Sequence, residues 1–145
     1  MTLNKDVNRE FKVSDDGYYE GYWDTDNKVK DGQGLMLFKD GSIYDGWWKD
    51  DKPHGKGVKI LPNKDVYYGE FKDGKMHGYG VFKKEDGSMY EGEWRNNLQH
   101  GEGIQTWNDG SSYDGAWEMG KKNGRGVFTW PDDSKYDGEF KNDIF

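Results

Sequence analysis

The sequence predicts an all-β fold, an elongated single-layer antiparallel sheet of about twelve strands made of stacked β-hairpins. One motif recurs along the chain at a nearly constant interval, and side chains alternate within it as they do in a strand. Hydrophobic residues are only 32% of the 145, whereas aromatic residues are 17% and glycine occurs 22 times. So few aliphatic side chains cannot fill a thick core. The sheet must therefore rest on aromatic rings, which bury about 150–250 Å² each.

The first strand of each unit is the motif Tyr-x-Gly-x-Trp, with Phe in place of Trp in two units. Its tyrosines are spaced by 25 residues and then by 23: Tyr19, Tyr44, Tyr67, Tyr90, Tyr113 and Tyr136. Residues at i, i+2 and i+4 of an extended chain share one face, and the positions between them are mostly acidic. The motif predicts one packed face, whose rings we expect to bind a partner: Tyr19, Trp23, Tyr44, Trp48, Tyr67, Phe71, Tyr90, Trp94, Tyr113 and Trp117.

The second strand of each unit starts at a Gly-x-Gly pair followed by an aliphatic residue. The pairs are Gly32/Gly34, Gly55/Gly57, Gly78/Gly80, Gly101/Gly103 and Gly124/Gly126. An Asp or Asn six residues after the second glycine marks a turn, and three of these turns read Asp-Gly-Ser, which is strong hairpin chemistry. Lys64 and Asp133 replace the turn glycine in the other two full units, so we expect those two turns to differ locally.

Half-units stand at both ends of the array. Phe11, Val13 and Asp16-Gly17 align with a second strand and its turn, so residues 1–18 are expected to form an N-terminal segment with a partial half-repeat. Residues 19–145 are expected to form the repeat domain, with five full repeats and a terminal half-repeat. The final motif strand is an open edge that presents unpaired backbone groups, and we expect end-to-end self-association or strand addition there. Its inward residues are Tyr136, Gly138 and Phe140.

Net charge and composition disfavour several classes of function and location. The net charge of −7 opposes nucleic acid as a partner, and the absence of cysteine removes disulfides and thiolate chemistry. Residues 1–10 are polar, so no signal peptide is expected, and no apolar run is long enough for a membrane span. The sequence predicts a soluble cytoplasmic protein.

Neither catalytic nor metal-binding residues are expected, and no cofactor. His54, His77 and His100 occupy one repeat position, 23 residues apart. This spacing places successive histidines about 10 Å apart, too far to share a metal ion, so a role in turns or packing is favoured. The segment from Asp24 to Lys28 begins like a calcium loop, but it lacks the glycine and the glutamate that such a loop needs.

The motifs resemble the MORN repeat (membrane occupation and recognition nexus) from Tyr19 to Phe145. The family's elements stand here as Tyr90-Glu91-Gly92-Glu93-Trp94, His100-Gly101-Glu102-Gly103 and Asp109-Gly110. Departures are Asp31 and Asn123 at the histidine position, Phe71 and Phe140 at the Trp position, and two extra residues between Trp23 and Gly32. The resemblance implies a non-catalytic scaffold that binds partner proteins in a cytoskeletal assembly, such as a ciliary axoneme or radial spoke.

Two other functions, a membrane tether and an enzyme, are less favoured by the sequence. A phospholipid-binding membrane tether would use the loop lysines, but these are interleaved with acids, and solubilising charge is the favoured explanation. The basic clusters are Lys49, Lys52, Lys56 and Lys59, and then Lys121, Lys122 and Arg125. An enzyme is not expected, because the repeats leave only residues 1–18 outside them.

Overall fold

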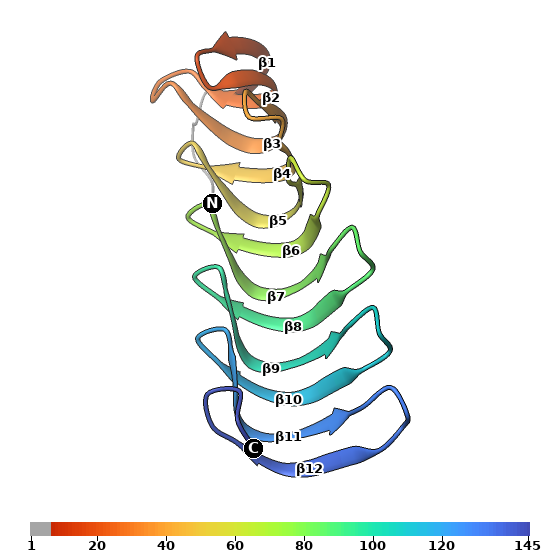
Figure 1. The fold of residues 1–145 in the computed structure, drawn as a ribbon. Helices are drawn as coiled ribbons and strands as arrows, with labels where there is room; N and C mark the ends of the chain where they lie inside the picture. The colour runs from red at the N-terminus through yellow and green to blue at the C-terminus, as the bar shows by residue number, and fades with distance from the viewer. Residues whose placement is uncertain (1–6) are drawn as a thin grey trace.

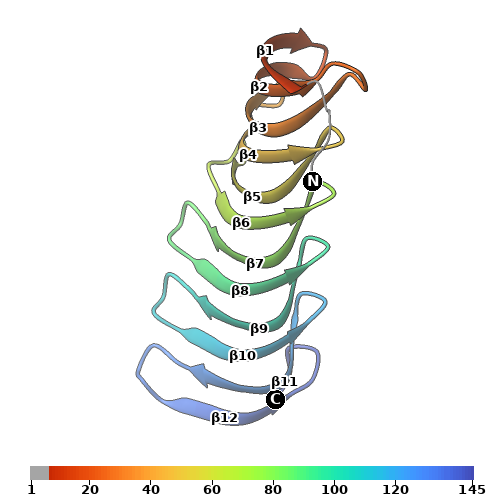
Figure 2. The same cartoon turned by 180° about the vertical axis from the view of Figure 1, so that it is seen from behind.

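The computed structural model describes residues 7–145 as one open antiparallel sheet in which each strand pairs with its neighbours in the chain. The strands lie side by side along a long trough (Figures 1 and 2), and residues 7–145 contain no helix, hence none that could span a membrane. The predicted array of hairpins is therefore confirmed. The strands are β1 (Val7–Ser14), β2 (Gly17–Asp24), β3 (Val29–Phe38), β4 (Ile43–Lys49), β5 (Lys52–Ile60), β6 (Val66–Lys72), β7 (Lys75–Lys83), β8 (Met89–Arg95), β9 (Leu98–Thr106), β10 (Ser112–Glu118), β11 (Lys121–Thr129) and β12 (Lys135–Phe140).

At the N-terminal end of the described chain, β1 pairs with β2 along its whole length. The ring of Phe11 meets Tyr18 of β2 edge-on, with centroids 4.7 Å apart. Of the segment predicted over residues 1–18, the first six residues lie outside the described part of the chain.

A continuous row of glycines crosses the sheet from β2 to β12. The tyrosine of each hairpin lies over the row glycine of the next strand, so a Cβ on Gly57 would lie 2.6 Å from Cζ of Tyr44. Only glycine fits beneath the ring. In β1, by contrast, Glu10 occupies this row opposite Gly21. The row consists of Gly21, Gly34, Gly46, Gly57, Gly69, Gly80, Gly92, Gly103, Gly115, Gly126 and Gly138.

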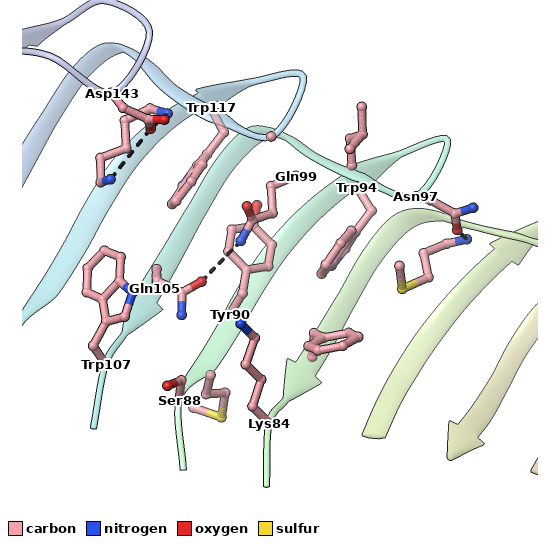
Figure 3. A pocket seen from close by; sticks show the side chains of 16 residues that line it. Lys84, Ser88, Tyr90, Trp94, Asn97, Gln99, Gln105, Trp107, Trp117 and Asp143 are labelled. Atoms are coloured by element: carbon pink, nitrogen blue, oxygen red, sulfur yellow. Dashed lines mark hydrogen bonds and ion pairs between the residues drawn. The ribbon is translucent and has the colours of Figure 1, made fainter. Parts of the chain in front are cut away.

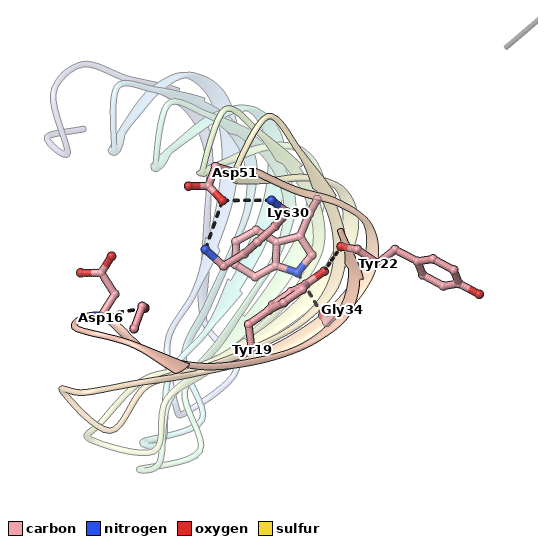
Figure 4. Close-up of polar contacts among 8 residues, drawn as sticks. Asp16, Tyr19, Tyr22, Lys30, Gly34 and Asp51 are labelled. Carbon is pink, nitrogen blue, oxygen red and sulfur yellow. Dashed lines mark hydrogen bonds and ion pairs between the residues drawn. The ribbon is translucent and has the colours of Figure 1, made fainter. Parts of the chain in front are cut away.

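A bulge in each of the five hairpins from β2–β3 to β10–β11 gives the sheet its curvature. In the β4–β5 hairpin, Gly46 pairs with Gly57 and Trp48 pairs with Pro53, so three residues of β5 stand opposite Trp47. Extra residues on one strand bend that strand and increase its twist. The motif residues line the inside of the resulting trough, whereas alternate positions lie on its convex outside. Figure 4 shows the two sides, with Tyr19 inside and Tyr22 pointing out.

The turns at the two long rims are regular. One rim has two-residue turns in which both residues have positive φ, as at Asn96 (48°) and Asn97 (70°). On the other rim, Asp40 Oδ1 accepts hydrogen bonds from the N–H and the hydroxyl of Ser42, at 2.8 and 2.6 Å. The two extra residues of the first repeat lie in the β2–β3 turn, where the N–H of Lys28 donates to Asp24 O over 2.8 Å.

The expectation that the turns at Lys64 and Asp133 differ locally is wrong for the backbone. Lys64 has φ 75° and Asp133 has φ 69°, close to the 93° of the turn glycine Gly41. The N–H of Lys64 donates to Leu61 O over 2.9 Å, as the N–H of Gly41 donates to Phe38 O over 3.0 Å. The hairpins on either side fix the turn, so the side chains accept a left-handed conformation that favours glycine.

Candidate binding site in the concave trough

Alternating rings form an unbroken column along the floor of the trough. From Tyr19 to Tyr113, each motif tyrosine contacts the Trp or Phe of its own strand and that of the next motif strand. Tyr90, for example, meets Trp94 with centroids 5.0 Å apart and Trp117 with centroids 5.4 Å apart, both edge-on. The Trp94 and Trp117 Nε1 atoms also donate to the carbonyls of Gly80 and Gly103, at 3.2 and 3.1 Å. The predicted column of rings is therefore the core of the protein.

The rings predicted as a partner-binding face are covered by one another. Nine of the ten are 0–8% exposed, and Trp23 is half-buried. Each tyrosine hydroxyl donates to a backbone carbonyl three residues on, as Tyr113 Oη does to Ala116 O over 2.7 Å. Burial raises the pKa of Tyr113 to about 12 and raises the pKa of Tyr19, Tyr44, Tyr67 and Tyr90 further. A partner on this side would meet mainly the side chains that stand above the rings.

Above the rings, the trough opens into a hollow of about 540 Å³ between β7 and β11. Figure 3 shows Trp94, Trp107 and Trp117 around it. A hydrogen bond from Gln99 Nε2 to Gln105 Oε1, 3.1 Å long, crosses its floor. A smaller hollow of about 220 Å³ adjoins it and shares Met76, Phe82 and Asn97. Together they form a groove that is open to solvent and has aromatic rings and this pair of glutamines at its floor.

Lysines give the groove a positive charge although the whole chain is negative. Lys122 Nζ lies 5.7 Å from the centroid of the Trp117 ring and 3.5 Å from Asp143 Oδ1. Lys30 of β3 is arranged in the same way in the N-terminal part of the trough, outside the groove. Its Nζ lies 5.3 Å from the centroid of the Trp48 ring and 3.2 Å from Asp51 Oδ1, and Figure 4 shows Lys30 beside Asp51. Lys59 and Lys84 line the two hollows, and within residues 7–145 neither has an ion pair. The groove therefore favours a ligand that is apolar and acidic.

The histidines act as links between hairpins. The Nδ1 atoms of His54, His77 and His100 each accept a hydrogen bond, 3.4 Å long, from a backbone N–H in the next two-residue turn or just before it. Within the described residues, no group of three or more His, Cys, Asp or Glu side chains is arranged to hold a metal ion. The Asp24 carboxylate accepts from the N–H groups of Asp26 and Asn27, both at 3.1 Å, so it closes its own turn.

The predicted edge strand is only partly open. Phe140 is buried in the ring column, and Tyr136 stacks against Phe145 with centroids 4.7 Å apart. A turn at Asn142 and Asp143 leads to a bridge between Lys141 and Ile144, so these residues lie at the C-terminal end of β12. On the side away from β11, the backbone from Tyr136 to Gly138 has no strand beside it within residues 7–145. Strand addition at this edge stays a prediction.

The convex face carries a second aromatic group, whose members lie outside the Tyr, Gly and Trp positions of the Tyr-x-Gly-x-Trp motif. Trp47, Tyr68 and Tyr79 line one hollow of about 640 Å³ and are 47%, 49% and 52% exposed. Each occupies a repeat position that is mostly charged in the other units. A comparison of the repeats with one another would have found all three.

A long open sheet of near-identical hairpins, held by a column of rings, defines the class of the molecule. It is an all-β repeat protein, a non-enzymatic type of fold. The chain belongs to the MORN repeat family, whose model matches six consecutive repeats at residues 19–43, 44–66, 67–89, 90–112, 113–135 and 136–145. A comparison with curated proteins finds no match.

Proposed function

We propose that the chain is a non-catalytic scaffold whose concave groove holds an acidic, apolar segment of a partner protein. The observation that carries this proposal is the open hollow of about 540 Å³ above the rings, with Lys84 at its wall. An amphipathic segment that fills such a groove covers apolar surface and pairs with the lysines. Membership of the MORN family supports a scaffold role. On that resemblance we assign the partner to a cytoskeletal assembly, with a ciliary axoneme or radial spoke as the specific setting.

The test compares two variants with the same change of charge. Lys84→Glu reverses the charge at the groove, whereas Lys83→Glu reverses it at the exposed neighbouring residue, which the strand alternation places on the convex face. Wild type and both variants are immobilised, and the proteins that each recovers from native cell extract are quantified. We expect Lys84→Glu to lose a set of proteins that Lys83→Glu retains. Equal recovery by both variants would refute binding in the groove.

A membrane tether is the second candidate, because the groove lysines also suit anionic lipid headgroups. Sedimentation with vesicles of phosphatidylcholine and phosphatidylserine at physiological salt separates the two functions. Binding by wild type that is lost in Lys84→Glu would assign the groove to a membrane surface. We expect no vesicle binding, because the outer face between β8 and β12 is rich in carboxylates such as Glu91, Asp114 and Asp137.

A further inference from the structure

The repeats provide an internal control for the convex face, because the same backbone recurs with different outward side chains. The position of Trp47 is held by Tyr22, Glu70, Glu93, Ala116 and Glu139 in the other units. Tyr68 replaces a carboxylate that every other unit has: Glu20, Asp45, Glu91, Asp114 and Asp137. The counterparts of Tyr79 are Gln33, Lys56, Glu102 and Arg125. The fold does not require rings at these three places.

The three departures converge on one hollow. Trp47 comes from β4, Tyr68 from β6 and Tyr79 from β7, yet all three line the same space of about 640 Å³, with Val58 between them. Their rings are about half exposed, which is unusual for three large side chains that share one site on a monomer. Tyr79 is held in place twice, because its N–H donates to Glu70 Oε2 over 2.6 Å and its hydroxyl donates to Glu91 Oε1 over 2.7 Å.

Carboxylates stand beside these rings. Asp45 lines the hollow and has no ion pair within residues 7–145. Glu70 also lines it, and its second oxygen, Oε1, makes no hydrogen bond or ion pair within these residues. Lys56 is the single cation among the lining residues. Aromatic faces attract cations electrostatically, and nearby carboxylates add to this attraction. Rings with acids around an apolar floor match a guanidinium or ammonium group on an alkyl stem.

The shape of the surface limits the occupant to a narrow segment. The sheet is curved outward on this side, as the view along the trough in Figure 4 shows at the equivalent residue Tyr22. Two convex sheets touch only along a line, so a second copy would cover little of the hollow. The residues that line the hollow come from five strands, β3 to β7, which span about 19 Å, the length of five or six extended residues.

We propose that Trp47, Tyr68 and Tyr79 form a binding site on the convex face for an arginine or lysine side chain carried by an extended segment of a partner protein. The site is separate from the concave groove and does not depend on the function proposed for that groove. A scaffold with two sites on opposite faces can hold two segments at once.

The test uses the full chain and the peptide acetyl-Gly-Leu-Arg-Leu-Gly-amide, followed through amide and indole N–H chemical shifts. The control peptide has citrulline in place of arginine, which keeps the shape and removes the charge. We expect saturable shifts of the Trp47 indole N–H and a dissociation constant at least about tenfold lower for the arginine peptide. Equal binding of both peptides would overturn the proposal, as would shifts confined to the acidic outer face of β8–β12.

A triple variant separates the rings from general negative charge. Trp47→Ala, Tyr68→Asp and Tyr79→Gln introduce residues that other units carry at the same positions, so the hairpins should fold. Because this variant lacks the Trp47 indole, binding is followed through backbone amide shifts such as that of Val58, which lines the hollow in every variant. The variant is more acidic than wild type, yet we expect it to lose these amide shifts, whereas Ile104→Ala on the same face should keep them. Stronger binding by the triple variant would contradict a ring-dependent site. Shifts of Trp47 that depend on protein concentration without peptide would identify a second copy as the occupant and overturn the proposal.

Discussion

Gly80 lies in the middle of the glycine row, where we predict that a single methyl group destabilises the whole column. A Cβ on Gly80 would lie 2.6 Å from Cε2 of Tyr67 and nearer still to Cζ and the hydroxyl oxygen. The ring must move away, which strains its contacts with Phe71 at 5.0 Å and Trp94 at 5.5 Å. The hydrogen bond from Tyr67 Oη to Glu70 O, 2.8 Å long, is then lost.

The magnitude follows from these two effects. Overpacking costs about 1–3 kcal/mol, and a lost hydrogen bond costs about 1 kcal/mol more. Gly80→Ala should therefore lower the free energy of unfolding by about 2–4 kcal/mol. The sign of this change in the free energy of unfolding also tests the reasoning. In an unobstructed strand, replacing glycine by alanine is expected to stabilise the protein by about 0.5–1 kcal/mol.

A double-mutant cycle measured by urea unfolding tests the cause. Tyr67→Ala removes the ring and should cost about 3–5 kcal/mol, as do other deletions of large buried rings. In that background Gly80→Ala should add less than about 0.5 kcal/mol, because nothing then lies over the glycine. If the two costs simply add, the ring is not the reason for the glycine, and the account of the row fails.

Three further outcomes are expected. Trp94→Ala should lower the free energy of unfolding by about 3–5 kcal/mol, because Trp94 is only 8% exposed. Trp47→Ala should lower it clearly less, because Trp47 is 47% exposed. Equal melting temperatures of the Trp94 variant and wild type would contradict the packing of the rings. The raised pKa of Tyr113, about 12 against 10.0, stabilises the fold fully below pH 10 and progressively less as the pH rises toward about 12. Urea midpoints from about pH 9 to about pH 11 should fall together with the appearance of tyrosinate absorbance, and a flat profile would disprove this coupling. Lys64→Gly should stabilise by about 0.5–1 kcal/mol, since φ is 75° there; a loss of stability on thermal melting would show that the turn is not strained.

The strands could be predicted because strand pairing imposes a period of two on the side chains. Tyr44, Gly46 and Trp48 share the inner face as their spacing indicates, and Gly46 pairs with Gly57 in the next strand. The bulge opposite Trp47 could not be predicted in this way, because extra residues in one strand leave the alternation of the other unchanged. The bulges curve the sheet, and that curvature helps to place the rings against one another.

The residues that a partner could reach were harder to predict, because the period of two says nothing about exposure. Alternation shows which side chains share a face, but exposure depends on how closely neighbouring hairpins approach. Tyr44 and Tyr90 are therefore buried although they lie on an open sheet. The side chains that a partner in the trough can reach include Lys84 and Trp107, which line the hollow above Tyr90. The turn at Lys64 was mispredicted for another reason. The backbone on either side of Lys64 decides the turn conformation, whatever the residue itself prefers.

Within residues 7–145 no strand pairs with the outer edge of β1, and we expect Glu10 to disfavour the addition of a second molecule at that edge. In the other hairpins, a tyrosine from the preceding strand covers the row glycine. A tyrosine strand of a second molecule that joined β1 in that register would bring its ring onto the Glu10 side chain, which stands in the row where strands β2 to β12 all have glycine. We therefore expect the array to resist head-to-tail growth into a fibre in this register. Any end-to-end contact at β1 must use a different register.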